Sequence, residues 1–424
     1  MRLLPLLLVA AALTGCDSGG ESEPEPGPPP PPEITRAELG QHLSALQKIA
    51  DEHGGTRAAG TPGDRASADY VAGRLRAARW RVQLQPVRFP YFEQKRATMS
   101  VAGRTLHRAR DFQVLSYSGS GRASGRLHRL LSGCSAEEFE DLRARDVPLV
   151  SRGECFFRVK ALNAQRAGAR ALVVIDLSPT RRGVPSGTLA APGVRIPVVL
   201  TDSAIPGAAV RLDVSAVSER RLTHNVIAET PGGEEGRLVM AGGHLDSVPG
   251  GPGINDNGSG AATLIEAAEA IGPDPPGARV RLAFWGAEEL GLLGSRRYVR
   301  SLARDERRRI RAYINLDIVG SPNAVPEFYA DGDARLAGVL RSAPGRSLGR
   351  VAAGGSSDHA PFQEAGVPVN GLYTGSTERG PGGRPRDPCY HLACDTVENV
   401  DQVVLLRMAR AAAGALRRLS AAGR

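Results

Sequence analysis

The chain has 424 residues, which is enough for one large domain and a smaller one. Its 41% hydrophobic and 23% charged residues are typical of a globular protein. The formal net charge of +9 raises the question of a nucleic-acid partner, but the basic residues are almost all arginine and are spread along the chain, with the densest group at residues 304–311. We interpret them as a solvated surface and predict no nucleic-acid site.

Residues 1–16 have the pattern of an export signal. Residues 3–13 are apolar but too few to span a bilayer as a mature helix. The run Leu13-Thr-Gly-Cys16 that follows resembles the lipobox of bacterial lipoproteins, in which cleavage before the cysteine leaves it lipidated. A plain secretory signal with an incidental cysteine is the alternative.

Residues 17–34 consist mainly of Gly, Ser, Glu and Pro. Such a segment cannot bury a core, so we expect an extended, Pro-rich tether. The mature protein is therefore expected to be exported and held at the membrane surface of the cell envelope by its lipid alone, or else secreted. A monomer is expected.

The remaining cysteines, Cys134, Cys155, Cys389 and Cys394, form an even set. In an exported protein this favours disulfides. Proximity along the chain favours the pairs Cys134–Cys155 and Cys389–Cys394, but it does not fix the connectivity. Zinc binding by these cysteines is disfavoured because no C-x-x-C pair is present.

Residues 35–113 are predicted to form the N-terminal part of the larger domain. Apolar residues at helical spacing predict a helix over residues 35–50, with Thr35 as its N-cap. The Gly-rich residues 54–63 are predicted to form a loop. A second helix and then a strand are expected over residues 64–78 and 79–89.

Residues 114–218 are predicted to form a small β-rich domain inserted into the larger one. Their short apolar runs lack histidines and acidic pairs at the strand ends. The region resembles the protease-associated domain, and the matching residues are 151–157 (Ser-Arg-Gly-Glu-Cys-Phe-Phe), Lys160, 167–169 (Ala-Gly-Ala) and 196–199 (Ile-Pro-Val-Val). In relatives, this module influences substrate access or partner contacts and performs no chemistry.

From residue 219 to the C-terminus at residue 424, strand and helix patterns alternate. The predicted strands are residues 225–229, 237–242, 279–285, 312–317, 326–330 and 367–372, and a final helix is predicted over residues 400–419. This alternation predicts an α/β sandwich with a mixed, mostly parallel sheet.

Three of these strands are followed by residues that can bind metals. His244 follows the strand at 237–242, Glu288 and Glu289 follow the strand at 279–285, and Asp317 ends the strand at 312–317. If the strands are parallel, these side chains lie along one edge of the sheet. Uncompensated carboxylates repel one another, and a pair of divalent cations would relieve the repulsion. Imidazole and carboxylate are ligands that suit zinc.

Five motifs in this order resemble those of the secreted bacterial dizinc aminopeptidases. They are Gly-His244-Leu-Asp246-Ser, Gly-Ile-Asn-Asp256-Asn-Gly-Ser-Gly, Trp285-Gly-Ala-Glu288-Glu289-Leu-Gly, Asn315-Leu-Asp317 and Cys389-Tyr390-His391. The resemblance covers residues 36–113 and 219–420. It implies a phosphorylase/hydrolase-like αβα sandwich that binds two Zn²⁺ ions.

The resemblance also implies a role for each motif residue. One zinc would be held by His244 and Asp317, the other by Glu289 and His391, and Asp256 would bridge them. Glu288 matches the family's general base, which activates a water shared by the two ions.

Further roles are expected for residues beside the ligands. Asp246 is expected to hydrogen-bond the far imidazole nitrogen of His244. Tyr390 is expected to donate its hydroxyl to the tetrahedral oxyanion, with a packed aromatic ring as the alternative. By resemblance, the peptide bond after Asp256 is expected to be cis. Ser356 stands where some relatives have an arginine, and His359 is expected to pack or cap rather than bind metal.

The main functional hypothesis is an exopeptidase that removes N-terminal residues from peptides or proteins. A carboxypeptidase or dipeptidase on the same dizinc scaffold is the second hypothesis. A non-catalytic, receptor-like module and a single-zinc glutaminyl cyclase are less favoured because the full set of dizinc ligands is present.

Overall fold

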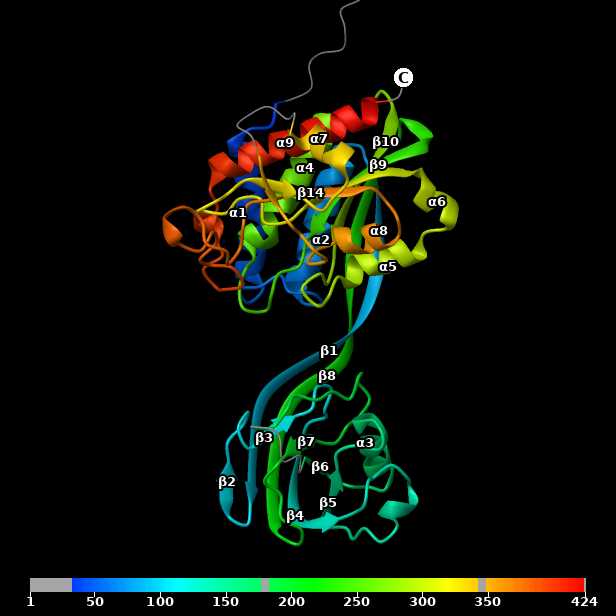
Figure 1. Cartoon of the computed structure of the whole chain (residues 1–424), viewed down its shortest axis with the longest axis vertical. Coiled ribbons are helices and arrows are strands. Elements are labelled where there is room, and N and C mark those ends of the chain that lie inside the picture. The colour runs from blue at the N-terminus through cyan, green and yellow to red at the C-terminus, as the bar shows by residue number, and fades with distance from the viewer. Residues whose placement is uncertain (1–32, 177–182, 342–347, 423–424) are drawn as a thin grey trace, which may run out of the picture.

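The computed structural model describes residues 33–176, 183–341 and 348–422. Figure 1 shows two lobes joined by a long antiparallel pair of strands, β1 (Arg81–Val101) and β8 (Ala209–Glu229). The predicted signal, Cys16 and all but the last residues of the predicted tether lie outside the described residues. No helix in the described ranges is long and apolar enough to cross a membrane.

The larger lobe contains a mixed sheet in the order β13-β12-β14-β11-β9-β10-β8, with β1 paired to β8. Its remaining strands are β9 (Glu234–His244), β10 (Ala278–Trp285), β11 (Ile310–Leu316), β12 (Glu327–Tyr329), β13 (Gly349–Val351) and β14 (Val369–Tyr373). The four central strands β10, β9, β11 and β14 are parallel, whereas β8 runs antiparallel to β10 and β12 runs antiparallel to β14. The predicted mixed, mostly parallel sheet is therefore confirmed.

Helices cover both faces of this sheet, and its central strands are therefore buried on both sides. Along β9, Val239 and Ala241 contribute to one core, and Leu238 and Met240 contribute to the other. The first core packs under α1 (Arg36–Glu52), α2 (Pro62–Ala77), α4 (Ser259–Ile271), α7 (Ala334–Arg341) and α9 (Gln402–Ala421). The second packs under α5 (Leu293–Ser301) and α8 (His359–Glu364), while α6 (Arg304–Arg309) contacts β9 and β11. The lobe is the predicted αβα sandwich.

The first helix shows how local sequence fixes an element. Thr35 and Glu38 form a capping box, in which the Thr35 hydroxyl accepts from the Glu38 N–H at 3.2 Å and the Glu38 carboxylate accepts from the Thr35 N–H at 3.1 Å. Leu39, Leu43 and Leu46 are fully buried, as their helical spacing predicts.

The smaller lobe is the β-rich insertion. It contains β2 (Arg104–Leu106), β3 (Phe112–Val114), β4 (Gly121–Arg129), β5 (Asp146–Ser151), α3 (Phe157–Arg166), β6 (Leu172–Ile175) and β7 (Val198–Thr201). The predicted boundary at residue 114 is too late, because Met99, Leu106 and Phe112 pack in the same core as Leu127 and Leu149. β1 runs from the larger lobe into the smaller one as a single strand, with a register shift between Gln94 and Arg96, so no loop marks the boundary.

Two disulfides stabilise loops in the two lobes. Cys134 bonds to Cys155 in the smaller lobe, and Cys389 bonds to Cys394 in the larger one. The pairing expected from proximity is confirmed. The second disulfide closes the loop that carries Tyr390 and His391.

Candidate metal centre

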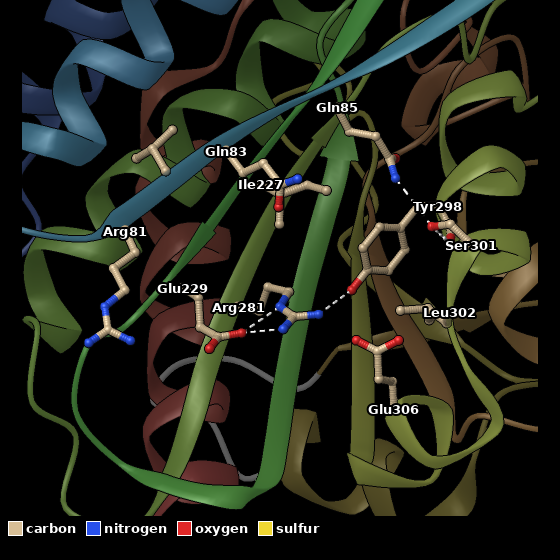
Figure 2. A pocket seen from close by; sticks show the side chains of 11 residues that line it. Arg81, Gln83, Gln85, Ile227, Glu229, Arg281, Tyr298, Ser301, Leu302 and Glu306 are labelled. Atoms are coloured by element: carbon tan, nitrogen blue, oxygen red, sulfur yellow. Dashed lines mark hydrogen bonds and ion pairs between the residues drawn. The ribbon is translucent and has the colours of Figure 1, made fainter.

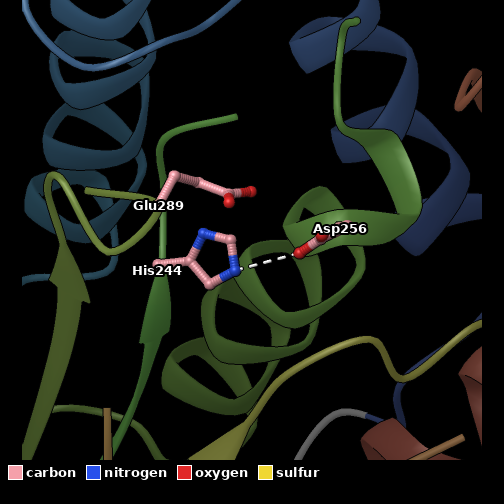
Figure 3. A group of neighbouring side chains, drawn as sticks. All are labelled: His244, Asp256 and Glu289. Carbon is pink, nitrogen blue, oxygen red and sulfur yellow. Dashed lines mark ion pairs between the residues drawn. The ribbon is translucent and has the colours of Figure 1, made fainter. Parts of the chain in front are cut away.

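The predicted ligands meet at the carboxyl edge of the parallel strands. His244 is the last residue of β9, Glu289 follows β10, and Asp317 follows β11. Asp256 lies in the kinked turn Ile254–Gly258 before α4, and His391 lies in the disulfide-closed loop. Figure 3 shows His244 and Glu289 directed toward Asp256, and ligand atoms of these three residues lie within 4.8 Å of one another.

The carboxylate of Asp256 lies between two imidazoles. Its Oδ1 is 3.0 Å from Nε2 of His244, and its Oδ2 is 3.2 Å from Nε2 of His391. On the first side, Oδ1 of Asp317 lies 3.3 Å from His244 Nε2, and on the second side, Oε2 of Glu289 lies 3.2 Å from His391 Nε2. Two groups of predicted ligands therefore share one carboxylate.

The electrostatics of the cluster favour positive charge at both positions. Burial lowers the pKa of His244, but neighbouring carboxylates, Glu288 foremost, outweigh it and raise that pKa well above its usual value. Hydrogen bonds with Asp256 and Glu289 raise the pKa of His391 to about 10. For Asp256, bonds to both imidazoles outweigh burial and lower the carboxyl pKa. A cation on each side of Asp256 would satisfy the same carboxylates.

The donor set fits zinc. Oε1 of Glu289 and Oδ1 of Asp317 are buried and accept no hydrogen bond from the described residues, although buried carboxylate oxygens normally have a partner. Two imidazole nitrogens and three carboxylates are the ligand types that zinc takes in catalytic sites. The geometry thus leaves acceptor positions that a metal ion would fill.

Asp246 contacts the far imidazole nitrogen of His244 as predicted, but through its main chain and not through its carboxylate. Nδ1 of His244 lies 3.0 Å from the main-chain carbonyl of Asp246, whereas its carboxylate Oδ1 is 3.8 Å away, too far for a hydrogen bond. The carboxylate instead accepts the backbone N–H groups of Glu288 at 3.1 Å and Glu289 at 3.4 Å. Which of these groups the Asp246 carboxylate contacts depends on its side-chain rotamer, and the spacing of residues in the sequence cannot predict a rotamer. Asp246 thus holds the loop that carries the predicted base and one predicted ligand.

Glu288 and Tyr390 lie beside the ligands. Burial raises the pKa of Glu288 well above its usual range, and Asp358 and Asp317 add to the rise although His244 opposes it. The ring of Tyr390 stacks on that of His391, with 3.8 Å between centroids. Burial and the nearby carboxylates raise the pKa of the tyrosine hydroxyl, so it stays protonated as a donor.

Two further expectations concern the backbone and the loop before α8. The peptide bond between Asp256 and Asn257 is cis, as expected. His359 packs instead of joining the cluster, because its Nε2 lies 3.2 Å from the Gly354 carbonyl and its ring lies against Tyr329. The exposed Ser356 donates its hydroxyl to the Ala353 carbonyl at 2.8 Å.

Arg57, for which the sequence indicated no role, is fully buried in the predicted loop 54–63. Its guanidinium donates to three main-chain carbonyls, those of Leu245, Pro252 and Gly253. These carbonyls lie at the two ends of the loop that connects His244 to the turn bearing Asp256. One side chain thus ties both ends of the ligand loop together. A single arginine among glycines carries no periodic signal that could have revealed this.

Asp395 and Ser357 were also missed. The carboxylate of Asp395 accepts the backbone N–H groups of Asn255 at 2.8 Å and Asp256 at 3.0 Å. The hydroxyl of Ser357 donates to Oδ2 of Asp317 at 2.6 Å. Both residues hydrogen-bond predicted ligands, as partners of metal ligands commonly do. In the sequence, a role for Asp395 was suggested only by its position directly after Cys394, and nothing suggested a role for Ser357.

Another polar groove lies on the sheet face between β1, β8, β10 and α5 (Figure 2). Its central Arg281 donates to the Glu229 carboxylate and to the hydroxyl of Tyr298. Because these polar groups are hydrogen bonded to one another, we interpret them as stabilising the fold, and we assign the groove no ligand.

Comparison with known proteins agrees with this geometry. A model of peptidase family M28 matches residues 225–416, and a PA domain model matches residues 127–205. An aminopeptidase of Pseudomonas aeruginosa is 35% identical over 415 residues, which cover 86% of this chain and 77% of that protein. The probable lipoprotein aminopeptidase LpqL of Mycobacterium tuberculosis is 36% identical over 411 residues, covering 86% of this chain and 81% of its own length.

A solved structure supports the same assignment. The zinc aminopeptidase BSAP of Bacillus subtilis superimposes with a TM-score of 0.59 at 28% identity, over 90% of this chain and 94% of that one. The similarity covers both lobes, including the regions that the M28 and PA domain models match. The protein therefore belongs to peptidase family M28 and carries an inserted PA domain.

Proposed function

We propose that the protein is a zinc-dependent aminopeptidase that holds two zinc ions at the carboxyl edge of its larger sheet. The observation that carries this proposal is the position of Asp256, whose two carboxylate oxygens face Nε2 of His244 at 3.0 Å and Nε2 of His391 at 3.2 Å. A carboxylate that faces two imidazoles in this way suits a bridging ligand in a two-metal site.

In this proposal, His244 and Asp317 hold one ion, Glu289 and His391 hold the other, and Asp256 is shared. Bound zinc supplies a Lewis acid for the scissile carbonyl and lowers the pKa of water. The residues themselves fix the ligand geometry before the metal binds, because each lies at a strand end or in a loop held by buried hydrogen bonds.

Glu288 is proposed as the general base. The backbone N–H of Glu288 donates to the Asp246 carboxylate at 3.1 Å. Glu288 therefore lies next to the proposed ligand Glu289, and its own side chain is not required as a ligand. Its carboxylate takes a proton from the attacking water and then gives it to the leaving amine. The protonated hydroxyl of Tyr390 donates to the oxyanion as negative charge develops.

The proposed substrate is a peptide or protein with a free N-terminus and a large apolar first residue. Support comes from relatives named for this activity, including the probable leucine aminopeptidase 2 of Trichophyton verrucosum, which is 30% identical over 96% of this chain and 90% of its own length. The smaller lobe is proposed to influence which peptides reach the centre.

We further propose that the protein is exported and anchored by a lipid on Cys16, with residues 17–34 as the tether. The M. tuberculosis relative is named a lipoprotein, and the two disulfides of this chain suit an oxidising compartment. Loss of radiolabelled palmitate from a Cys16→Ser variant, with label retained in the wild type, tests the anchor.

The test of the enzymatic proposal compares leucine-p-nitroanilide with its N-acetylated form, with zinc content measured on the same preparation. We expect two zinc ions per chain and hydrolysis of the free amine alone. Hydrolysis of N-blocked peptides from their C-termini would instead indicate a carboxypeptidase. Absence of bound metal after zinc reconstitution would contradict catalysis and indicate a receptor-like module.

A further inference from the structure

Arginine side chains line a pocket at the edge of the sheet opposite to the metal centre. The pocket has a volume of about 500 Å³ and lies among β9, α6, β11, α7 and the end of α9. Its basic residues are Arg237, Arg307, Arg308, Arg311 and Arg335, and no Asp or Glu is among the described residues that line it. Three of these residues, Arg307, Arg308 and Arg311, belong to the arginine-rich segment 304–311, which the catalytic proposal leaves without a role.

The positive charge of this pocket is only partly compensated. Arg237 and Arg308 each pair with a neighbouring carboxylate. Within the described part of the chain, Arg307, Arg311 and Arg335 form no ion pair, and Nε of Arg307 is buried without a hydrogen-bond partner. Crowded guanidinium groups repel one another, and a multivalent oxyanion is the ligand that their planar donors match best.

The pocket lies close to the point where the described chain begins. Arg410 of α9 pairs with the Glu33 carboxylate and donates to the Ile34 carbonyl at 3.1 Å, while Leu419 of the same helix lines the pocket. Nine residues of helix separate them, which corresponds to about 14 Å at 1.5 Å per residue. In Figure 1, α9 crosses the end of the larger lobe remote from the smaller lobe.

The parallel strands place the pocket and the catalytic centre at opposite edges. On β9, Arg237 lines the pocket and His244 ends the strand at the metal centre, and seven residues of strand correspond to about 23 Å. A surface that contacts the pocket therefore leaves the opposite edge of the sheet, with the proposed metal centre, accessible.

We propose that this pocket binds the phosphate of anionic lipid headgroups and so orients the tethered enzyme with its catalytic edge away from the membrane. The proposal rests on the lipid anchor proposed above. Residues 17–34 can span at most about 60 Å, which keeps the pocket at a high effective concentration near the bilayer. Each basic side chain adds to attraction by an anionic surface.

The test measures cosedimentation with vesicles by the zinc-loaded chain that starts at Asp17, which carries no lipid. The vesicles contain phosphatidylcholine alone or with phosphatidylglycerol. We expect binding only to the anionic vesicles. The pocket variant Arg307→Gln/Arg311→Gln/Arg335→Gln is expected to bind about a hundredfold more weakly, at about fivefold per arginine, with unchanged leucine-p-nitroanilide hydrolysis.

The matched control removes three exposed arginines from other surfaces, Arg88→Gln/Arg104→Gln/Arg145→Gln, and changes the net charge equally. Retained vesicle binding by this control supports a site at the pocket. Equal weakening of both variants would show diffuse charge attraction and overturn the proposal. Binding of inorganic phosphate in a calorimeter without vesicle binding would also overturn it, by identifying a site for free phosphate. Because the chain in this test has no lipid, its outcome is independent of palmitate labelling at Cys16.

Discussion

Replacing Arg57 should weaken zinc binding although Arg57 touches no proposed ligand. The Arg57→Met variant keeps the length of the side chain but leaves the carbonyls of Leu245, Pro252 and Gly253 without their donor. Each buried carbonyl that loses its partner costs about 1–3 kcal/mol, and relaxation of the loop recovers part of this. Loss of a residue that orients metal ligands commonly lowers metal affinity about 10–100-fold, and we expect this range.

The assay is a competition titration of zinc against a chelator, with thermal unfolding of the apo and zinc-loaded forms. Arg57→Lys separates charge from geometry, because an ammonium keeps the charge but cannot fan out to three carbonyls. It should give an intermediate affinity. Arg65→Met, at an exposed position in the neighbouring helix, is the control. If Arg57→Met lowers both unfolding temperatures equally and leaves zinc affinity unchanged, Arg57 only stabilises the fold and the reasoning is wrong.

Two more predictions concern the metal centre, and a third concerns the smaller lobe. Glu288→Gln should lower kcat at least about 100-fold with zinc content unchanged, since it removes only the proton acceptor; retained turnover would exclude Glu288 as the base. Asp395→Asn should weaken zinc binding about 10–100-fold in the chelator titration, because one of the two amides beside the bridging carboxylate loses its acceptor; unchanged affinity would contradict this. In the smaller lobe, hydrogen bonds from Gly133 and Ser132 outweigh burial and lower the pKa of Glu138 to about 2, so its stabilisation is present above about pH 4.5 and is lost as pH falls toward 2. An NMR titration of the Glu138 carboxyl should show this low midpoint, and a midpoint near 4.5 would refute the contacts.

The sequence predicts the sheet and the meeting of the proposed ligands at its edge, because both depend on local patterns. Buried strands appear as apolar runs, and polar residues directly after parallel strands must lie at one edge. His244, Glu289 and Asp317 could therefore be placed from their positions alone, while Asp256 and His391 needed the family resemblance.

Features that depend on tertiary contacts could not be predicted. Arg57 acts on a loop about 190 residues later in the chain, as in its contact with Leu245, and no local pattern records that contact. The boundary of the insertion was misplaced because β1 passes through both lobes as one strand. The carboxylate of Asp246 turns to backbone N–H groups instead of His244, a choice between rotamers that depends on the surrounding packing.

The central claim is that two zinc ions share Asp256. Anomalous diffraction at the zinc edge from crystals of the zinc-loaded protein tests it most directly. We expect two peaks, one between Asp256, His244 and Asp317 and the other between Asp256, Glu289 and His391. Two zinc ions in a site of this class lie about 3.5–4 Å apart. A single peak, or peaks that do not contact Asp256, would contradict the account.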